Sequence, residues 1–156
     1  MSDKIFIGID PDVDESGVTI IQEALKSPFD LTIQKLKFFE LYHCLKYAFT
    51  YTNDMGKEIR EPIKIYIEAG WLNQKSNWHS EGKGENVASR IGKNVGANHQ
   101  VGKLIAEMCE YLKLEYELVQ PRTSKMPVKL FRKMTKYTGK LDQDMVDAAM
   151  LVYGRV

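Results

Sequence analysis

The sequence has few cysteines, and their spacing suits neither zinc nor a disulfide framework. Its 156 residues include two, Cys44 and Cys109, which lie far apart in segments with helical spacing. Zinc sites need Cys and His at short, repeated spacings, and disulfide frameworks need several pairs. We therefore expect both cysteines to be small core residues of a protein from a reducing, cytoplasmic compartment.

Long apolar runs and nucleotide-binding motifs are also missing. No run approaches the about 20 apolar residues that cross a bilayer, and the first four residues lead straight into a strand-like run rather than a signal peptide. No G-x-x-x-x-G-K-[ST] loop is present. The composition, 44% hydrophobic and 28% charged, is that of an ordinary globule. We expect residues 1–156 to form a single domain with no membrane contact.

Charge is distributed unevenly along the chain. Residues 1–70 carry eight Lys or Arg against twelve Asp or Glu, a balance of −4, whereas residues 71–156 carry fourteen against nine, a balance of +5. Residues 122–140 contain seven basic side chains and no acid. Such a cluster suits a polyanion, because each neutralised phosphate releases a condensed counterion. The alternative is a solvated basic helix.

Apolar periodicity predicts an α/β fold. Strand-like runs cover residues 4–10, 18–22, 30–39, 63–68 and 114–119. Helical spacing covers 41–52, 94–113 and 144–153, and the Gly-, Asn-, Ser- and Lys-rich stretch 69–93 indicates a surface loop. This order predicts a five-stranded mixed β-sheet flanked by α-helices.

Acids at the ends of elements are the main functional signal. Asp10 closes the first strand and Glu68 closes the fourth, and sites gather at the carboxyl ends of strands in open α/β sheets. Asp144 and Asp147 are three residues apart, so they share one face of the last helix with Cβ atoms about 5–6 Å apart. Acids in a first helical turn can simply complement the helix dipole, but Asp147 lies too deep in the helix for that role.

Four converging carboxylates would bind hard cations. Oxygen ligands suit Mg²⁺ or Mn²⁺, and two such ions about 3.5–4 Å apart can activate a water and stabilise the leaving oxygen of a phosphodiester. We therefore predict that Asp10, Glu68, Asp144 and Asp147 are both the catalytic residues and the ligands of two Mg²⁺ ions, for which Mn²⁺ could substitute.

Three segments together resemble one family. Phe6-Ile7-Gly8-Ile9-Asp10-Pro11, Ile65-Tyr66-Ile67-Glu68 and Asp144-x-x-Asp147-Ala148-Ala149 are similar, in order and spacing, to the acidic segments of RuvC-type Holliday junction resolvases in the RNase H-like superfamily. The resemblance implies an RNase H-like fold and a Mg²⁺-dependent endonuclease that cleaves branched DNA in recombination and repair. It implies a homodimer, since symmetric cleavage of a four-way junction needs two active sites.

The resemblance also assigns DNA contacts. Trp71 stands where the family carries an aromatic that stacks at the junction centre, although it could equally be a partly buried loop residue, and Trp78 could substitute for it. Lys125 stands where the family keeps a basic residue near the scissile phosphate. The small residues Gly96, Ala97 and Gly102 would serve a dimer interface or packing within the chain. The predicted phosphate-binding residues are Arg122, Lys125, Lys129, Arg132 and Lys133.

The sequence also departs from the family pattern. Asp12 replaces the usual glycine after Asp-Pro, and Asp14 and Glu15 follow it; whether Asp12, Asp14 or Asp142 assists the metal site is left open. The stretch from 125 to 144 is shorter than in the bacterial enzymes. The alternatives are an RNase H-type or other structure-specific nuclease, and a non-catalytic DNA-binding module. An actin-like ATPase would need about twice this length.

Overall fold

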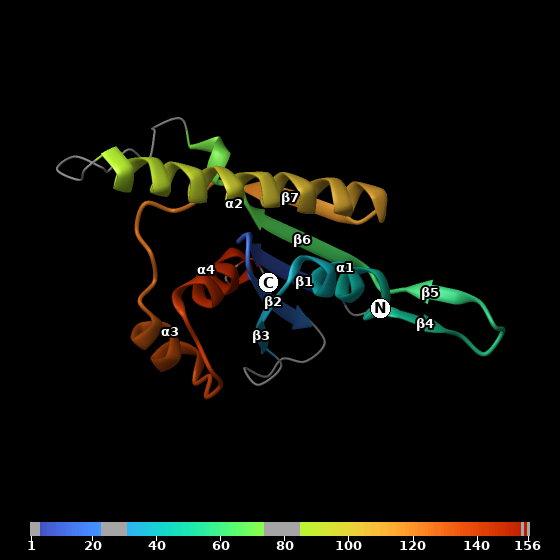
Figure 1. The fold of residues 1–156 in the computed structure, drawn as a ribbon. Helices are drawn as coiled ribbons and strands as arrows, with labels where there is room; N and C mark the ends of the chain where they lie inside the picture. The colour runs from blue at the N-terminus through green and yellow to red at the C-terminus, as the bar shows by residue number, and fades with distance from the viewer. Residues whose placement is uncertain (1–3, 23–30, 74–84, 154, 156) are drawn as a thin grey trace.

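A computed structural model describes residues 4–22, 31–73, 85–153 and 155. A five-stranded sheet lies at its centre in the order β3-β2-β1-β6-β7 (Figure 1). β2 is antiparallel to both of its neighbours, and the other contacts, β1 with β6 and β6 with β7, are parallel. The predicted α/β fold, a five-stranded mixed sheet flanked by helices, is confirmed. The strands are β1 Ile5–Asp10, β2 Ser16–Gln22, β3 Leu31–Leu36, β6 Ile63–Glu68 and β7 Glu115–Val119.

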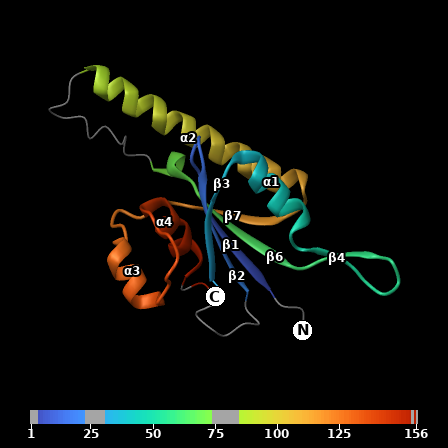
Figure 2. The ribbon, with the colours of Figure 1, turned by 60° about the horizontal axis from the view of Figure 1, so that its bottom comes forward.

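Helices cover both faces of the sheet (Figure 2). α1 (Phe38–Tyr47) and α2 (Glu85–Tyr111) lie on one face. α4 (Gln143–Val152) lies on the other, with α3 (Val128–Thr135) packed outside it. Among the described residues, no helix is long and apolar enough to cross a membrane.

Side-chain alternation in the central strands divides the core into two parts. Ile5, Ile7 and Ile9 are fully buried in the larger cluster, together with residues of α1 and α2. Phe6 packs instead with Leu151 and Val152 of α4. The even-numbered positions of β1 therefore face α4, and Asp10 is the last of them.

Five elements differ from the sequence-based expectation: α1, β4 (Thr50–Thr52), β5 (Glu58–Arg60), α2 and α3. The helix predicted to reach Thr52 ends at Tyr47, because the β-branched and aromatic run Thr50–Thr52 forms β4, which pairs with β5 (Glu58–Arg60). Gly56 adopts a positive φ of 74° in the turn between them. α2 begins at Glu85 inside the predicted loop, and the basic segment contains the helix α3, which is shorter than the window of about 11–18 residues in which helical periodicity is sought.

Candidate active site

The sheet brings Asp10 and Glu68 to the same level. β1 and β6 are parallel neighbours in which Ile9 pairs with Ile67, so the acid that follows each isoleucine ends its strand beside the other. Ile65 and Ile67 belong to the core cluster on the α1–α2 side, so alternation turns Glu68 toward α4, as it does Asp10. Two carboxylates therefore project from adjacent strand ends toward one helix.

Glycines let α4 approach these strands until its backbone touches them. A Cβ on Gly8 would stand 2.1 Å from the carbonyl oxygen of Ala148, and one on Gly17 would stand 2.5 Å from the carbonyl oxygen of Asp144. Ala148 and Ala149 are fully buried at this contact. Ala148 of α4 thus meets Gly8 of β1, and the Asp144 backbone meets Gly17 of β2. This close approach carries the α4 acids to the strand ends.

Asp147 lies at the inner end of the acidic group and is held by two donors. Asp147 is 6% exposed. An isolated buried charge is costly, so a buried acid needs partners. Lys125 Nζ donates to Oδ2, and Gln143 Nε2 donates to Oδ1 at 2.8 Å. Gln143 also donates to the carbonyl oxygen of Met126 at 3.0 Å, which ties Asp147 to the loop before α3.

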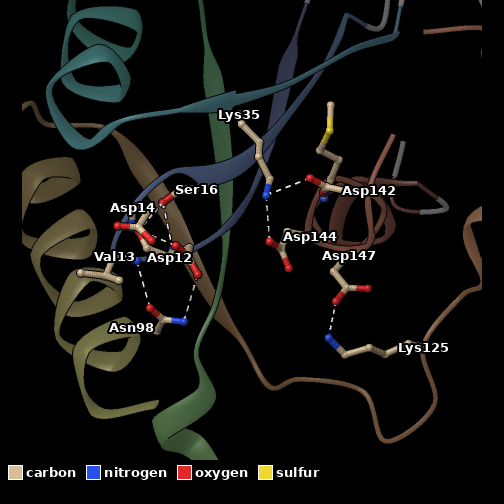
Figure 3. A network of polar contacts seen from close by, with 11 residues as sticks. Asp12, Val13, Asp14, Ser16, Lys35, Asn98, Lys125, Asp142, Asp144 and Asp147 are labelled. Atoms are coloured by element: carbon tan, nitrogen blue, oxygen red, sulfur yellow. Dashed lines mark hydrogen bonds and ion pairs between the residues drawn. The ribbon is translucent and has the colours of Figure 1, made fainter. Parts of the chain in front are cut away.

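Asp144 lies nearer the surface and shares a lysine with the helix cap. Lys35 Nζ is 3.0 Å from Asp144 Oδ2 and 2.8 Å from Asp142 Oδ2 (Figure 3). Asp142 is the N-cap of α4 and accepts a hydrogen bond from the Met145 amide at 3.0 Å. The structure therefore explains Asp142 as a capping residue, while Asp144 stays beside the other acids.

Burial and neighbouring charges perturb the two strand-end acids, Asp10 and Glu68. Burial, reinforced by the negative charges of Glu68, Asp144 and Asp147, raises the pKa of Asp10 to about 8. Burial also raises the pKa of Glu68, with contributions from Asp147 and Asp144, while Lys125 opposes the rise. Both strand-end carboxylates thus hold protons more tightly than usual in the absence of a cation.

This shift predicts a pH-dependent stability in EDTA. The Asp10 carboxyl is ionised above about pH 4 in the unfolded chain but keeps its proton to about pH 8 in the folded one. The folded state therefore binds more protons in this window, and stability falls as pH rises, by at most about 1.4 kcal/mol per unit. We expect the Tm of the parent, measured by scanning fluorimetry, to fall by several degrees relative to Asp10→Asn between about pH 5 and pH 8. Parallel curves for the two proteins would contradict the shift.

A hydrogen-bond network locks the turn after Asp10 to α2. The Asp12 amide donates to Ser16 Oγ at 3.1 Å, and the Val13 amide donates to Asn98 Oδ1 at 2.9 Å (Figure 3). Asn98 Nδ2 donates to Asp12 Oδ2 at 3.2 Å, and the other Asp12 oxygen accepts from the Asp14 amide. Both oxygens of Asp12 are thereby engaged in holding the turn.

A wide groove passes over the acids. Asp10, Glu68 and Asp144 lie along it, and α2, η1 (Gly70–Leu72) and residues 120–125 form its walls. Arg122 and Lys125, two predicted phosphate-binding residues, line this groove. The other three, Lys129, Arg132 and Lys133, are on α3, where Arg132 donates to the carbonyl oxygens of Tyr137 and Gly139.

Trp71 also lines the groove, packed against α2. Its ring occupies the space that a Cβ on Gly102 would need, 2.5 Å from the nearest ring atom. Lys103 Nζ lies 5.8 Å from the ring centroid, and His99 meets the ring edge-on at 6.1 Å. Gly102 thus serves packing within the chain, whereas a Cβ on Gly96 would meet nothing within 4 Å. Trp78 lies outside the described residues.

The acids fit a divalent cation by chemistry and charge rather than by their present spacing. All the donors are carboxylate oxygens, the set that Mg²⁺ and Mn²⁺ prefer, and two lysines neutralise part of the charge as the structure stands. Within the described ranges, no three His, Cys, Asp or Glu side chains are close enough to hold one ion. Ion binding would therefore draw the carboxylates closer together.

Sequence reasoning missed two residues of this site, Lys35 and Gln143. Lys35 comes from β3, 109 positions before its partner Asp144, and no local pattern indicates such a contact. Gln143 lies four residues before Asp147, a spacing at which helical side chains meet. That spacing could have revealed it.

Comparisons with known proteins give a weak likeness to a solved structure. No family model and no curated protein matches the chain. Among solved structures, it is similar to T. thermophilus RuvC in complex with a Holliday junction substrate, over 97% of this chain and 95% of that one. Sequence identity is 10% and the TM-score is 0.45.

Proposed function

We propose that the chain is a metal-dependent endonuclease that cleaves branched DNA, with the four-way junction as its substrate. The observation that carries the proposal is the meeting of Asp10 and Glu68, from adjacent strand ends, with Asp144 and Asp147 from a helix packed backbone to backbone on those strands. A structural role does not account for such a group, because burial and the neighbouring negative charges raise the pKa of Asp10 and Glu68, which destabilises the fold without a cation.

In the proposed site the four acids hold the metal ions, and Gln143 and Lys125 support Asp147. Asp10, Glu68, Asp144 and Asp147 would hold two Mg²⁺ ions or Mn²⁺ in their place. When bound, the ions supply activation of the attacking water and stabilisation of the leaving oxygen, so the chain needs no separate general base. Gln143 orients Asp147 by holding one of its oxygens, and Lys125 neutralises the other until substrate and ions arrive.

The basic residues would position the phosphates. Arg122 and Lys125 line the groove beside the acids, where their charge would hold the backbone at the scissile phosphate. Lys129 and Lys133 are exposed on α3 and would extend that contact along one DNA arm, together with Arg132. Trp71, at the groove wall, would contact bases at the branch point.

We also propose a two-fold dimer working in the cytoplasm. Paired cleavage of a symmetric junction requires two active sites related by a two-fold axis. Leu104 and Tyr111 on α2 are 40% and 77% exposed, which gives this helix apolar side chains at its surface. Light scattering after gel filtration tests the dimer independently of cleavage.

The function is tested with a labelled synthetic four-way junction, a linear duplex of the same sequence and an RNA–DNA hybrid, each with Mg²⁺, Mn²⁺ or EDTA. We expect paired nicks in the junction that require a divalent ion and are absent from the duplex. Preferential cleavage of the hybrid would assign an RNase H-type activity instead. Tight junction binding without cleavage in either metal would identify a non-catalytic binding module.

A further inference from the structure

A second cavity adjoins the acids, here called the side pocket. It has a volume of about 240 Å³ and lies between residues 119–127, Leu130 of α3 and the C-terminal half of α4. Glu68, Arg122 and Lys125 line both the side pocket and the groove. The two cavities thus share a wall, and that wall carries a predicted metal ligand and both phosphate-binding residues of the groove.

The side pocket combines apolar walls with a cationic rim, and two of the predicted metal ligands, Glu68 and Asp147, also line it. Met126, Leu130 and Met150 supply apolar surface, and methionines adapt their shape to flat, polarisable groups. Arg122 and Arg155 add positive charge, and the Arg155 guanidinium lies 5.0 Å from the centroid of the Tyr66 ring. The matching ligand has a flat, weakly polar ring system joined to an anion.

Size restricts the ligand further. Pockets that enclose drug-sized molecules hold roughly 300–1,000 Å³, so a cavity of about 240 Å³ admits one heteroaromatic ring system. A stacked base pair would not enter it. A single unpaired nucleobase, linked through its sugar to a phosphate, meets the demands of size, apolarity and charge together.

We propose that the side pocket receives one unpaired nucleobase of the DNA strand, adjacent to the phosphate held by Arg122 and Lys125, and that its fit determines which sequence is cleaved. This inference rests on the proposed function. Bases at a branch point are the least costly to unpair, and extruded bases are held between apolar side chains. The shared wall places such a base beside the acids.

Gln143 connects the pocket to the chemistry. Its amide donates both to the Met126 carbonyl oxygen, in the pocket wall, and to Asp147 Oδ1, in the acidic group. A base seated against Met126 would therefore be held in fixed register with Asp147. Recognition of the base and alignment of the neighbouring phosphate then depend on the same hydrogen-bonded unit.

The test compares Leu130→Trp with Met134→Trp. Both residues lie one helical turn apart on α3 and are similarly exposed, 45% and 46%, but Leu130 lines the pocket and Met134 does not. A junction carrying 2-aminopurine at an unpaired position beside the cleavage site is bound in EDTA, so that no cleavage is needed. We expect the parent and Met134→Trp to raise the 2-aminopurine emission, and Leu130→Trp to give about a tenfold smaller rise at equal DNA occupancy.

Cleavage supplies a second measurement, on junctions in which the base beside the cut is varied. The parent and Met134→Trp should prefer the same base, whereas Leu130→Trp should cleave junctions with different bases at similar rates. An equal emission rise in both variants, with unchanged base preference, would contradict the proposal that the side pocket binds a base. Junction cleavage without any emission rise in the parent would overturn it too, while leaving the nuclease intact. A pocket-dependent rise without cleavage of any substrate would reject the proposed nuclease and retain the pocket. Leu130→Phe provides a smaller filling group if the tryptophan lowers the Tm.

Discussion

The Asp10→Asn variant is expected to bind a four-way junction as tightly as the parent, or more tightly, and to cleave it about 1,000-fold more slowly. The change removes one negative oxygen from the proposed metal ligands at nearly constant shape. Metal-ion stabilisation of the developing charge is worth several kcal/mol, and each about 1.4 kcal/mol is a factor of ten in rate. Binding should persist, because the phosphate contacts come from basic residues. Single-turnover cleavage and gel-shift titration measure the two quantities.

Asp54→Asn is the matched control for this prediction. Asp54 is an exposed acid in the turn between β4 and β5, so its loss should leave both rate and affinity unchanged. If Asp10→Asn lost binding together with cleavage, a folding defect would explain the result. A cleavage rate within about tenfold of the parent would remove Asp10 from the chemistry.

The second large effect is expected from Gly8→Ala, one added methyl group at the centre of the sheet. Its carbon would stand 2.1 Å from the Ala148 carbonyl oxygen, and a helix backbone cannot move aside as a side chain can. Overpacking usually costs about 1–3 kcal/mol and sometimes more; we expect at least about 3 kcal/mol here, because all of α4 must shift. Urea unfolding followed by circular dichroism measures the loss. Folded protein should also cleave poorly, since α4 carries Asp144 and Asp147.

Gly96→Ala is the matched control for Gly8→Ala and should have the opposite effect on stability. Gly96 lies within α2, and a Cβ there meets nothing within 4 Å. Replacing an unconstrained helical glycine should raise stability by about 0.5–1 kcal/mol. A Gly8→Ala variant as stable as the parent would show that the contact between α4 and β1 is looser than described.

Much of the fold could be predicted because its central strands carry strong local signals. The apolar run ending at Asp10 and the run ending at Glu68 were placed within one residue of β1 and β6. The sequence predicts a later start for α2, at residue 94, because the N-terminal half of this helix is rich in Gly, Asn, Ser and Lys rather than amphipathic. The sequence does not predict the hairpin of β4 and β5, because the helical spacing expected over 41–52 extends into β4.

In the site, contacts between residues close in sequence could be predicted, and contacts between residues distant in sequence could not. Asp144 and Asp147 could be paired from helical spacing, and the structure places them near the two strand-end acids that the sequence singled out. Lys35 could not be found, because its ion pairs join β3 to α4 across most of the chain. The role of Lys125 as partner of Asp147 likewise depends on how residues 120–127 fold back over α4.

The contact of α4 with Gly8 and Gly17 determines where the site can adjust. With no layer of side chains between helix and sheet at this point, there are no rotamers whose rearrangement would let the backbones slide. The remaining freedom belongs to the few rotatable bonds of the carboxylates and to the two long lysine arms that hold them. Gathering the acids around an ion then orders little of the chain, so most of the conformational entropy of assembling the centre has already been lost on folding.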